Sequence, residues 1–270
     1  MMARLARVDI GRRLITGFVC LFFLFMTLPI AIVVVASFTD ASFVAFPIDK
    51  WSLRWFRRIF EYQPYLESAR VSVEIAFGAT AISCLVGVPA AIALARSSSA
   101  WASATMTYLL SPLSMPMIVI GFAALFFLSR VGIGVSFTAL LIAHTTVCLP
   151  YVVRTVAATY RGTDRGLEEA AALLGANPLQ VFWHVILPLI RPGIVAGSLF
   201  SFLVSFDNLP ISYFFGSPDT LTLPVVMLSY MEHQFDPSIA ALSTLQLLFA
   251  VICLVVVDRL YGIENMTVGR

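Results

Sequence analysis

The chain has 270 residues, of which 60% are hydrophobic and 12% are charged, and its formal net charge is +2. Soluble domains are about 45–50% apolar and about 25% charged, so an ordinary soluble domain is excluded and an all-α polytopic membrane protein is predicted. The arginines lie near the ends of apolar segments rather than in one basic patch, which argues against a nucleic-acid-binding protein.

Six apolar segments are long enough to cross the hydrocarbon core of a membrane, which takes about 20 helical residues. They span residues 14–38, 70–94, 105–128, 135–158, 192–215 and 238–258. The first segment is longer than the core of a signal peptide, which has about 7–15 apolar residues, so we expect it to be a retained span.

The distribution of basic residues predicts the orientation of these spans. With the N-terminus inside, eleven basic residues between Arg4 and Arg270 fall on the cytosolic side, whereas six between Lys50 and Arg130 fall outside. We therefore expect both termini to lie in the cytosol.

The loop after the first span contains the stretch WSLRWFRRIF, residues 51–60. Its spacing predicts a helix with one apolar and one basic face, formed by Trp51, Trp55, Ile59 and Phe60 and by Arg54, Arg57 and Arg58. This pattern is typical of a helix that lies in the membrane interface. Such a helix serves as a plain anchor, or else as a lid or a surface for a soluble partner.

Polar residues in the middle spans have local interpretations. Glu74 follows Arg70 by four residues, a spacing that predicts an ion pair on one helix face. Arg154 lies near the cytosolic end of its span, and we expect its side chain to extend to the interface. We expect His144 to make a polar packing contact or to line a path through the helix bundle.

The largest cytosolic linker, residues 159–191, is predicted to form two short helices. Thr163 or Asp164 is placed to cap the first helix, two carboxylates follow in its first turn, and an alanine-rich run favours helix. Gly175 then supplies the left-handed residue that commonly ends a helix.

The second short helix is predicted from the residues at its start. Asn177 is a good N-cap, Pro178 suits the first helical position, and Gln180 completes the spacing of a capping box. Pro188 is expected to break or kink this helix, because proline lacks the backbone N–H that a helix interior needs.

The first short helix combines small apolar side chains with the carboxylates of Glu168 and Glu169. Ala170, Ala171 and Leu174 form a flat apolar patch beside them. An apolar patch that faces water usually marks a partner surface. A structural elbow that packs on its own bundle explains the same residues equally well.

This stretch resembles the EAA signature of ABC importer permeases, which reads E-A-A-x3-G-x9-I-x-L-P. The matching residues are Glu169-Ala170-Ala171, Gly175 and Val185-Ile186-Leu187-Pro188. Val185 in place of isoleucine is a conservative departure. The flanking segments LPYVVRTVAATY (149–160) and SFLVSFDNLPISYFF (201–215) look most like the second permease of spermidine/putrescine-type importers.

The resemblance implies one transmembrane permease domain over residues 1–270, whose two short helices dock on a separate ATPase subunit. By carry-over, the docking residues are Glu169, Ala170, Ala171 and Gly175. Glu168 and Leu174, which belong to the same patch, are further docking candidates. The one lysine, Lys50, lacks a glycine-rich phosphate loop, so ATP and Mg²⁺ are expected on the ATPase. The chain itself is expected to be no enzyme and to bind no cofactor.

The family also implies the partners and the location. The partners are a homologous permease, two ATPase subunits and an extracytoplasmic solute-binding protein, and the location is the bacterial inner membrane. An ion-coupled secondary transporter is less favoured, because the sequence shows one clear intramembrane acid and no inverted repeat. An intramembrane enzyme or a metal site is not favoured either, because the histidines and the four cysteines are scattered without catalytic or ligand spacing.

Asp207 is the clearest candidate for the substrate path. A charged residue at the centre of a span costs about 2.5–3.5 kcal/mol on insertion scales. No lysine or arginine occurs between Arg191 and Arg259, so a cationic substrate or an arginine of another helix is needed to neutralise it. A structural hydrogen bond between helices is the alternative.

Three neighbours, Asn208, Tyr213 and Phe214, join Asp207 as candidate path residues. The aromatic rings would offer cation–π surface if they face inward, but they fit an aromatic belt equally well. Asp219, Glu232 and Asp236 follow as an acidic mouth. We expect a small, polyamine-like solute, and the alternatives within the family are iron, phosphonate, opine or amino-acid-like solutes.

Overall fold

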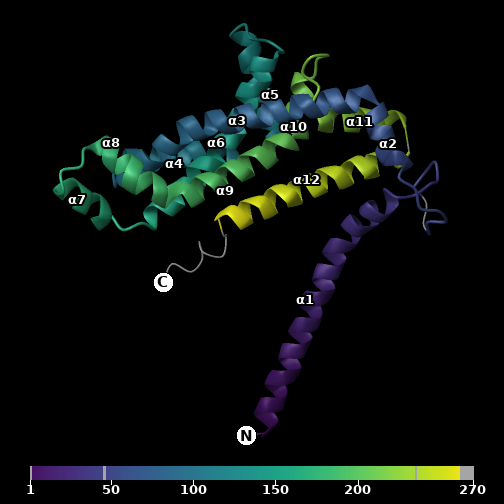
Figure 1. Cartoon of the computed structure of the whole chain (residues 1–270), viewed down its shortest axis with the longest axis horizontal. Coiled ribbons are helices and arrows are strands. Elements are labelled where there is room, and N and C mark those ends of the chain that lie inside the picture. The colour runs from purple at the N-terminus through teal and green to yellow at the C-terminus, as the bar shows by residue number, and fades with distance from the viewer. Residues whose placement is uncertain (1, 45–46, 235, 262–270) are drawn as a thin grey trace. The chain divides into compact units, whose positions relative to one another are not determined.

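The computed structural model describes residues 2–44, 47–234 and 236–261, with side chains described only from residue 11 to residue 260 (Figure 1). The side chains of Arg4 and Arg7 and the whole of Arg270, which contribute to the predicted orientation, lie outside the described residues. The described elements are helices, and one isolated antiparallel bridge pairs Thr39 with Trp51 in the loop between the first two helices.

The chain forms two compact units, which are described separately. The first combines Met1–Gln63 with Met231–Leu248, and the second combines Pro64–Tyr230 with Phe249–Arg270. The helices of the first part of the chain are α1 (Met2–Ala36), α2 (Arg54–Glu61), α3 (Gln63–Arg96), α4 (Ala100–Leu110), η1 (Ser111–Ser114), α5 (Met117–Arg130) and α6 (Phe137–Arg161). They are followed by α7 (Gly166–Leu173), α8 (Pro178–Val181), η2 (Phe182–Ile186), α9 (Leu187–Phe206), α10 (Leu209–Ser212), η3 (Tyr213–Phe215), α11 (Leu223–His233) and α12 (Ser238–Tyr261).

Five of the described helices are long and apolar enough to cross a membrane, and a sixth span results if a bent pair counts as one. The predicted segment 105–128 is that pair, because Ala100–Ser114 and Met117–Arg130 meet at 108°. Pro112 and Pro116 explain the bend. Proline lacks a backbone N–H, and Pro116 also holds the preceding Met115 in an extended conformation.

The predicted amphipathic stretch 51–60 forms helix α2, but its apolar residues do not share one environment. Trp55 and Ile59 are buried, whereas Trp51 and Phe60 are exposed. Arg54 stacks 4.4 Å from the centre of the Trp55 ring and donates a hydrogen bond to the Asp40 carbonyl at 2.8 Å. The apolar face is therefore split between the protein interior and the surface, and the roles predicted for this helix stay predictions.

Helices α6 and α9 pack closely in the second unit, and glycines on α9 make the close approach possible. A Cβ atom at Gly197 would lie 3.0 Å from the Cα of Val152 and would clash with the hydroxyl of Thr155. Gly193 meets Thr159 in the same way one turn earlier. Small residues at such contacts let the backbones of membrane helices approach each other.

We expect Gly197→Leu to destabilise the protein, because the backbone of Val152 cannot rotate away from the new side chain. Overpacking of this kind costs about 1–3 kcal/mol. The measurement is the melting temperature and the monodisperse yield of the detergent-solubilised protein. The matched control is Gly17→Leu, since a Cβ at Gly17 meets no atom within 4 Å. Equal behaviour of the two variants would contradict the packing argument.

Candidate functional site

The first short helix of the linker, α7, ends as its sequence predicts, but it does not begin at a predicted cap. Neither predicted cap occupies the N-cap position, which is Arg165 without a side-chain cap, although the Asp164 carboxylate accepts the N–H of Gly166, the first helical residue, at 2.8 Å. The hydroxyl of Thr163 donates instead to the carbonyl of Tyr160 at 2.7 Å. Gly175 has a φ of +89° and ends the helix in the left-handed region, as predicted.

The second short helix begins with the predicted capping box. Asn177 accepts the Gln180 N–H, and Gln180 accepts the Asn177 N–H, each at 2.9 Å. Pro178 occupies the first turn. Helix α8 then continues through η2 into α9, so that one helix runs from Pro178 to Phe206.

Pro188 does not break this helix, which corrects one of the two expectations for that residue. The turn before it, Phe182–Ile186, is a wide π-helical turn, in which the N–H of Leu187 bonds to the carbonyl of Phe182. The extra residue in this turn makes room for the proline ring and keeps the neighbouring backbone hydrogen-bonded. The helical path therefore passes from the linker into the span without interruption.

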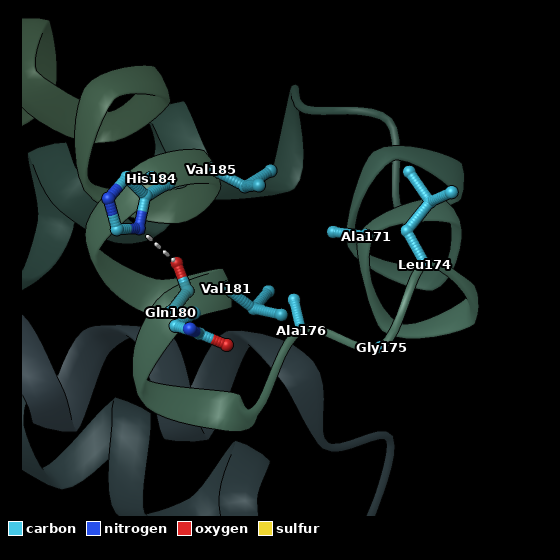
Figure 2. A pocket seen from close by; sticks show the side chains of 8 residues that line it. All are labelled: Ala171, Leu174, Gly175, Ala176, Gln180, Val181, His184 and Val185. Carbon is cyan, nitrogen blue, oxygen red and sulfur yellow. Dashed lines mark hydrogen bonds between the residues drawn. The ribbon is translucent and has the colours of Figure 1, made fainter.

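A groove lies between the two short helices (Figure 2). Its lining residues are Ala171, Leu174, Gly175, Ala176, Gln180, Val181, His184 and Val185. Figure 2 shows Ala171 and Leu174 on one wall and Val181, His184 and Val185 on the other. His184 is exposed, and its Nδ1 lies 3.0 Å from the carbonyl oxygen of Gln180. Small residues leave the groove open between α7 and α8.

Large apolar side chains surround this groove and are exposed to solvent. Leu173 and Leu174 are 89% and 90% exposed, and Leu179 and Trp183 are exposed as well. Of these four, only Leu174 is among the residues predicted to dock, although the other three are equally apolar. A group of exposed apolar side chains of this kind usually marks an interaction surface.

The two adjacent carboxylates of α7 have different environments. Glu169 is exposed together with Ala170, whereas Glu168 is only 8% exposed. Arg96 donates to Glu168 Oε2 at 2.5 Å, and Tyr160 donates to Glu168 Oε1 at 2.7 Å. Among the six residues predicted to dock, Glu168 therefore faces the bundle, and the others lie on the exposed side or line the groove.

Asp207 lies where helix α9 ends, not within a continuous span. The predicted segment 192–215 is broken after Phe206, and α10 begins at Leu209. Asp207 is exposed, whereas Asn208 is buried, and Asn208 Oδ1 caps α10 by accepting the Ile211 N–H at 3.0 Å. An asparagine cap followed by Pro210 explains the break, because both favour the start of a new helix.

His144 holds the two sides of this break together. It is fully buried, with Nδ1 2.8 Å from the hydroxyl of Ser205 on α9 and Nε2 3.0 Å from the hydroxyl of Ser212 on α10. This confirms the predicted polar packing contact. The sequence does not reveal these partners, which lie 61 and 68 residues away.

The remaining candidate residues have mixed environments. Tyr213 is 60% exposed, and Phe214 packs edge-on against Phe122 with ring centres 6.0 Å apart. Of the acidic residues beyond them, Asp219 is exposed, whereas the Asp236 carboxylate accepts the N–H of Ser238, the first residue of α12, at 2.9 Å. The predicted ion pair between Arg70 and Glu74 is confirmed at 2.7 Å.

A family model described as "Binding-protein-dependent transport system inner membrane component" matches residues 87–265, which include the whole linker and the Asp207 break. The chain belongs to this family. It is therefore a permease subunit of the inner membrane, and permease subunits of this family are not enzymes.

Named relatives cover most of the permease. The spermidine/putrescine transport system permease protein PotC of Haemophilus influenzae is 32% identical over 249 residues, which is 92% of this chain and 96% of the relative. The putrescine transport system permease protein PotI of Escherichia coli is 32% identical over 83% of this chain and 82% of its own. The molybdenum transport system permease protein ModB of Mycobacterium bovis is 34% identical over 69% of this chain and 75% of its own.

Solved structures agree on the fold of the permease. A bacterial ABC transporter for import of the acidic polysaccharide alginate matches with a TM-score of 0.72, at 15% identity, over 94% of this chain and 97% of that chain. The same kind of transporter in complex with a pentasaccharide-bound periplasmic protein matches with a TM-score of 0.64, at 15% identity, over 94% and 96%. At these identities the likeness supports the fold alone.

Proposed function

We propose that this permease carries a small polyamine-like cation into the cytosol. The observation that carries the proposal is that the relatives named for spermidine/putrescine and for putrescine match 92% and 83% of the chain. Asp207 adds a chemical reason, because it is an exposed acid at a helix break in a segment without lysine or arginine from 192 to 258. A carboxylate at membrane depth is suited to a cationic ligand.

In the proposed transport cycle, the part that moves first is the elbow, which comprises α7, the turn at Gly175 and α8. ATP binding draws two ATPase subunits together, and the ATPase moves the elbow that is docked on it. The movement shifts the bundle between inward- and outward-facing states, and the solute passes between this permease and a homologous one. An extracytoplasmic solute-binding protein delivers the solute. ATP and Mg²⁺ bind to the ATPase, and this chain needs no cofactor.

The proposed docking surface comprises the exposed part of the elbow. It consists of Glu169, Ala170, Ala171, Leu173, Leu174, Gly175, Leu179 and Trp183. The proposed orientation has both termini in the cytosol, because this places the elbow on the side where ATP is available. The proposed path includes Asp207, with Tyr213 as an exposed aromatic neighbour. Asn208 and Phe214 support the path from within the protein.

Co-purification tests the role as an ABC importer subunit. We expect a tagged chain to pull down an ATPase from native membranes, and we expect Glu169→Arg to lower both the recovered ATPase and solute uptake. A reversed charge at a docking surface opposes association with the same partner. Glu67→Arg on α3 is the matched control, because Glu67 is also exposed. An absent ATPase, or intact uptake in Glu169→Arg, would refute the proposal.

The relative named for molybdenum transport favours a second candidate function, the import of another small solute. Competition for uptake distinguishes the two. Excess spermidine or putrescine should suppress uptake of a labelled polyamine, whereas excess of a molybdenum salt should not. Absence of labelled polyamine uptake, together with uptake of a labelled molybdenum salt, would reject the polyamine and support the second candidate.

A further inference from the structure

The carboxylate of Glu168 joins three helices on the inner side of the elbow. Its two oxygens have different donors, with Arg96 at the end of α3 on one and Tyr160 near the end of α6 on the other. Glu168 itself lies in the first turn of α7. Because the residue is 8% exposed, neither oxygen has free access to water in place of these partners.

A second arginine also connects α7 with the end of α3, but here the donor lies on the α7 side. Arg165, directly before α7, donates to the carbonyls of Ala95 and Arg96, each at 3.3 Å. These carbonyls belong to the last turn of α3, where no intrahelical donor is available. The end of α3 and the start of α7 therefore hold each other through two arginines, one from each side.

The exposed side of the same short helix carries the proposed docking residues. Glu169 and Ala170 face solvent directly beside Glu168. Helix α7 has only eight residues, so a force on its exposed side reaches its buried side without an intervening element. The connection from α6 to α7 is a short turn, which by itself does not transmit motion to α3.

We propose that Glu168 is a positioning residue that links the ATPase-docking elbow to α3 and α6, so that both helices follow the movement of α7. The inference rests on the proposed function. It assigns Glu168 to the transmission of movement and not to direct contact with the ATPase. The transmission depends on the two donors, Arg96 and Tyr160, being held by one carboxylate.

The test uses the complete importer in liposomes with its binding protein, and it measures labelled solute uptake and ATP hydrolysis in the same vesicles. We expect Glu168→Gln to assemble with the ATPase and to hydrolyse ATP, but to move about tenfold less solute per ATP, since a charge-assisted hydrogen bond is lost. Tyr160→Phe removes the hydroxyl that donates to Glu168 and changes the side-chain volume little. We expect it to lower the amount of solute moved per ATP by a smaller factor.

Glu169→Gln is the matched comparison, because it removes the same charge from the exposed neighbour. We expect it to weaken ATPase association and to lower both rates together, with the ratio of solute to ATP unchanged. If Glu168→Gln or Tyr160→Phe also leaves this ratio unchanged, the two contacts are only structural and the inference is overturned. If the unmodified chain recovers no ATPase, the proposed function fails instead.

If Glu168→Gln does not assemble, the decision rests on Tyr160→Phe, which retains the ion pair between Glu168 and Arg96. A fall in its solute-to-ATP ratio supports the link. If Glu168→Gln does assemble, the double variant Glu168→Gln/Tyr160→Phe provides a further measurement, because residues that act through one network have non-additive effects. A double variant whose fall in the solute-to-ATP ratio equals the combined falls of the two single variants would contradict a shared carboxylate.

Discussion

Replacing Gly175 by valine is expected to lower uptake by about tenfold or more and to reduce ATPase recovery. Gly175 has a φ of +89°, where a β-branched residue is a severe outlier. Left-handed backbone costs an ordinary residue about 1–2 kcal/mol, which shifts the population of the turn by about 5- to 30-fold. The turn joins the two walls of the groove. Its loss would therefore remove the fixed arrangement of α7 and α8 on which the docking surface depends.

Gly175→Asn is the control that separates backbone strain from side-chain bulk. A Cβ at Gly175 meets no atom within 4 Å, so the chain has room for either residue. Asparagine tolerates left-handed backbone far better than valine. We therefore expect near-normal uptake and ATPase recovery in Gly175→Asn. Equal loss in both variants would show that the partner excludes any side chain there, and equal retention would show that the turn is dispensable.

Asp207→Asn is expected to lower polyamine uptake by about tenfold or more without lowering ATPase recovery. A hydrogen bond to a charged group contributes about 1.5–3 kcal/mol, and asparagine keeps the shape of the side chain but not the charge. The variant alters the break after α9 and leaves the elbow, at the other end of the same helix, intact. The measurement is labelled spermidine or putrescine uptake as a function of solute concentration.

Asp207→Glu keeps the charge and serves as the comparison. We expect it to retain more transport than Asp207→Asn, because its carboxylate still faces the same exposed position. Unchanged transport in Asp207→Asn would remove Asp207 from the path. Loss of ATPase recovery in Asp207→Asn would instead indicate a folding role, since Asp207 lies far along the helix from the docking surface.

The elbow could be predicted from the sequence because its geometry is local. Asn177 and Gln180 are three residues apart, and a capping box needs nothing from the rest of the chain. The same holds for Gly175, whose left-handed backbone requires only the absence of a side chain. Pro188 was harder, because a proline within a helix is accommodated by a wide turn that no residue type signals in advance.

The breaks in the spans could be predicted only in part. Apolar length identified the segment 105–128 but not its bend of 108°, because length counts residues and does not detect a change of direction. Asn208 and Pro210 carried a signal for the start of a new helix, which the high hydrophobicity of the segment 192–215 concealed. A cap-and-proline pair inside an apolar run is therefore better interpreted as a break.

The burial of Glu168 and the exposure of Glu169 could not be predicted from the sequence. The two residues are adjacent and chemically identical, and the difference depends on Arg96, which is 72 residues away. His144 is a similar case, because its serine partners come from two later helices. Contacts between helices depend on how the helices pack, and neither composition nor local spacing contains that information.

The uninterrupted helix from Pro178 to Phe206 connects the elbow directly to the break at Asp207. At about 1.5 Å per residue, its 29 residues extend about 43 Å. For a straight helix of this length, a tilt of about 5° at the elbow would displace the far end by about 4 Å. With the ATPase docked as proposed, a modest rocking of the elbow would therefore become a larger displacement beside Asp207, the proposed path residue.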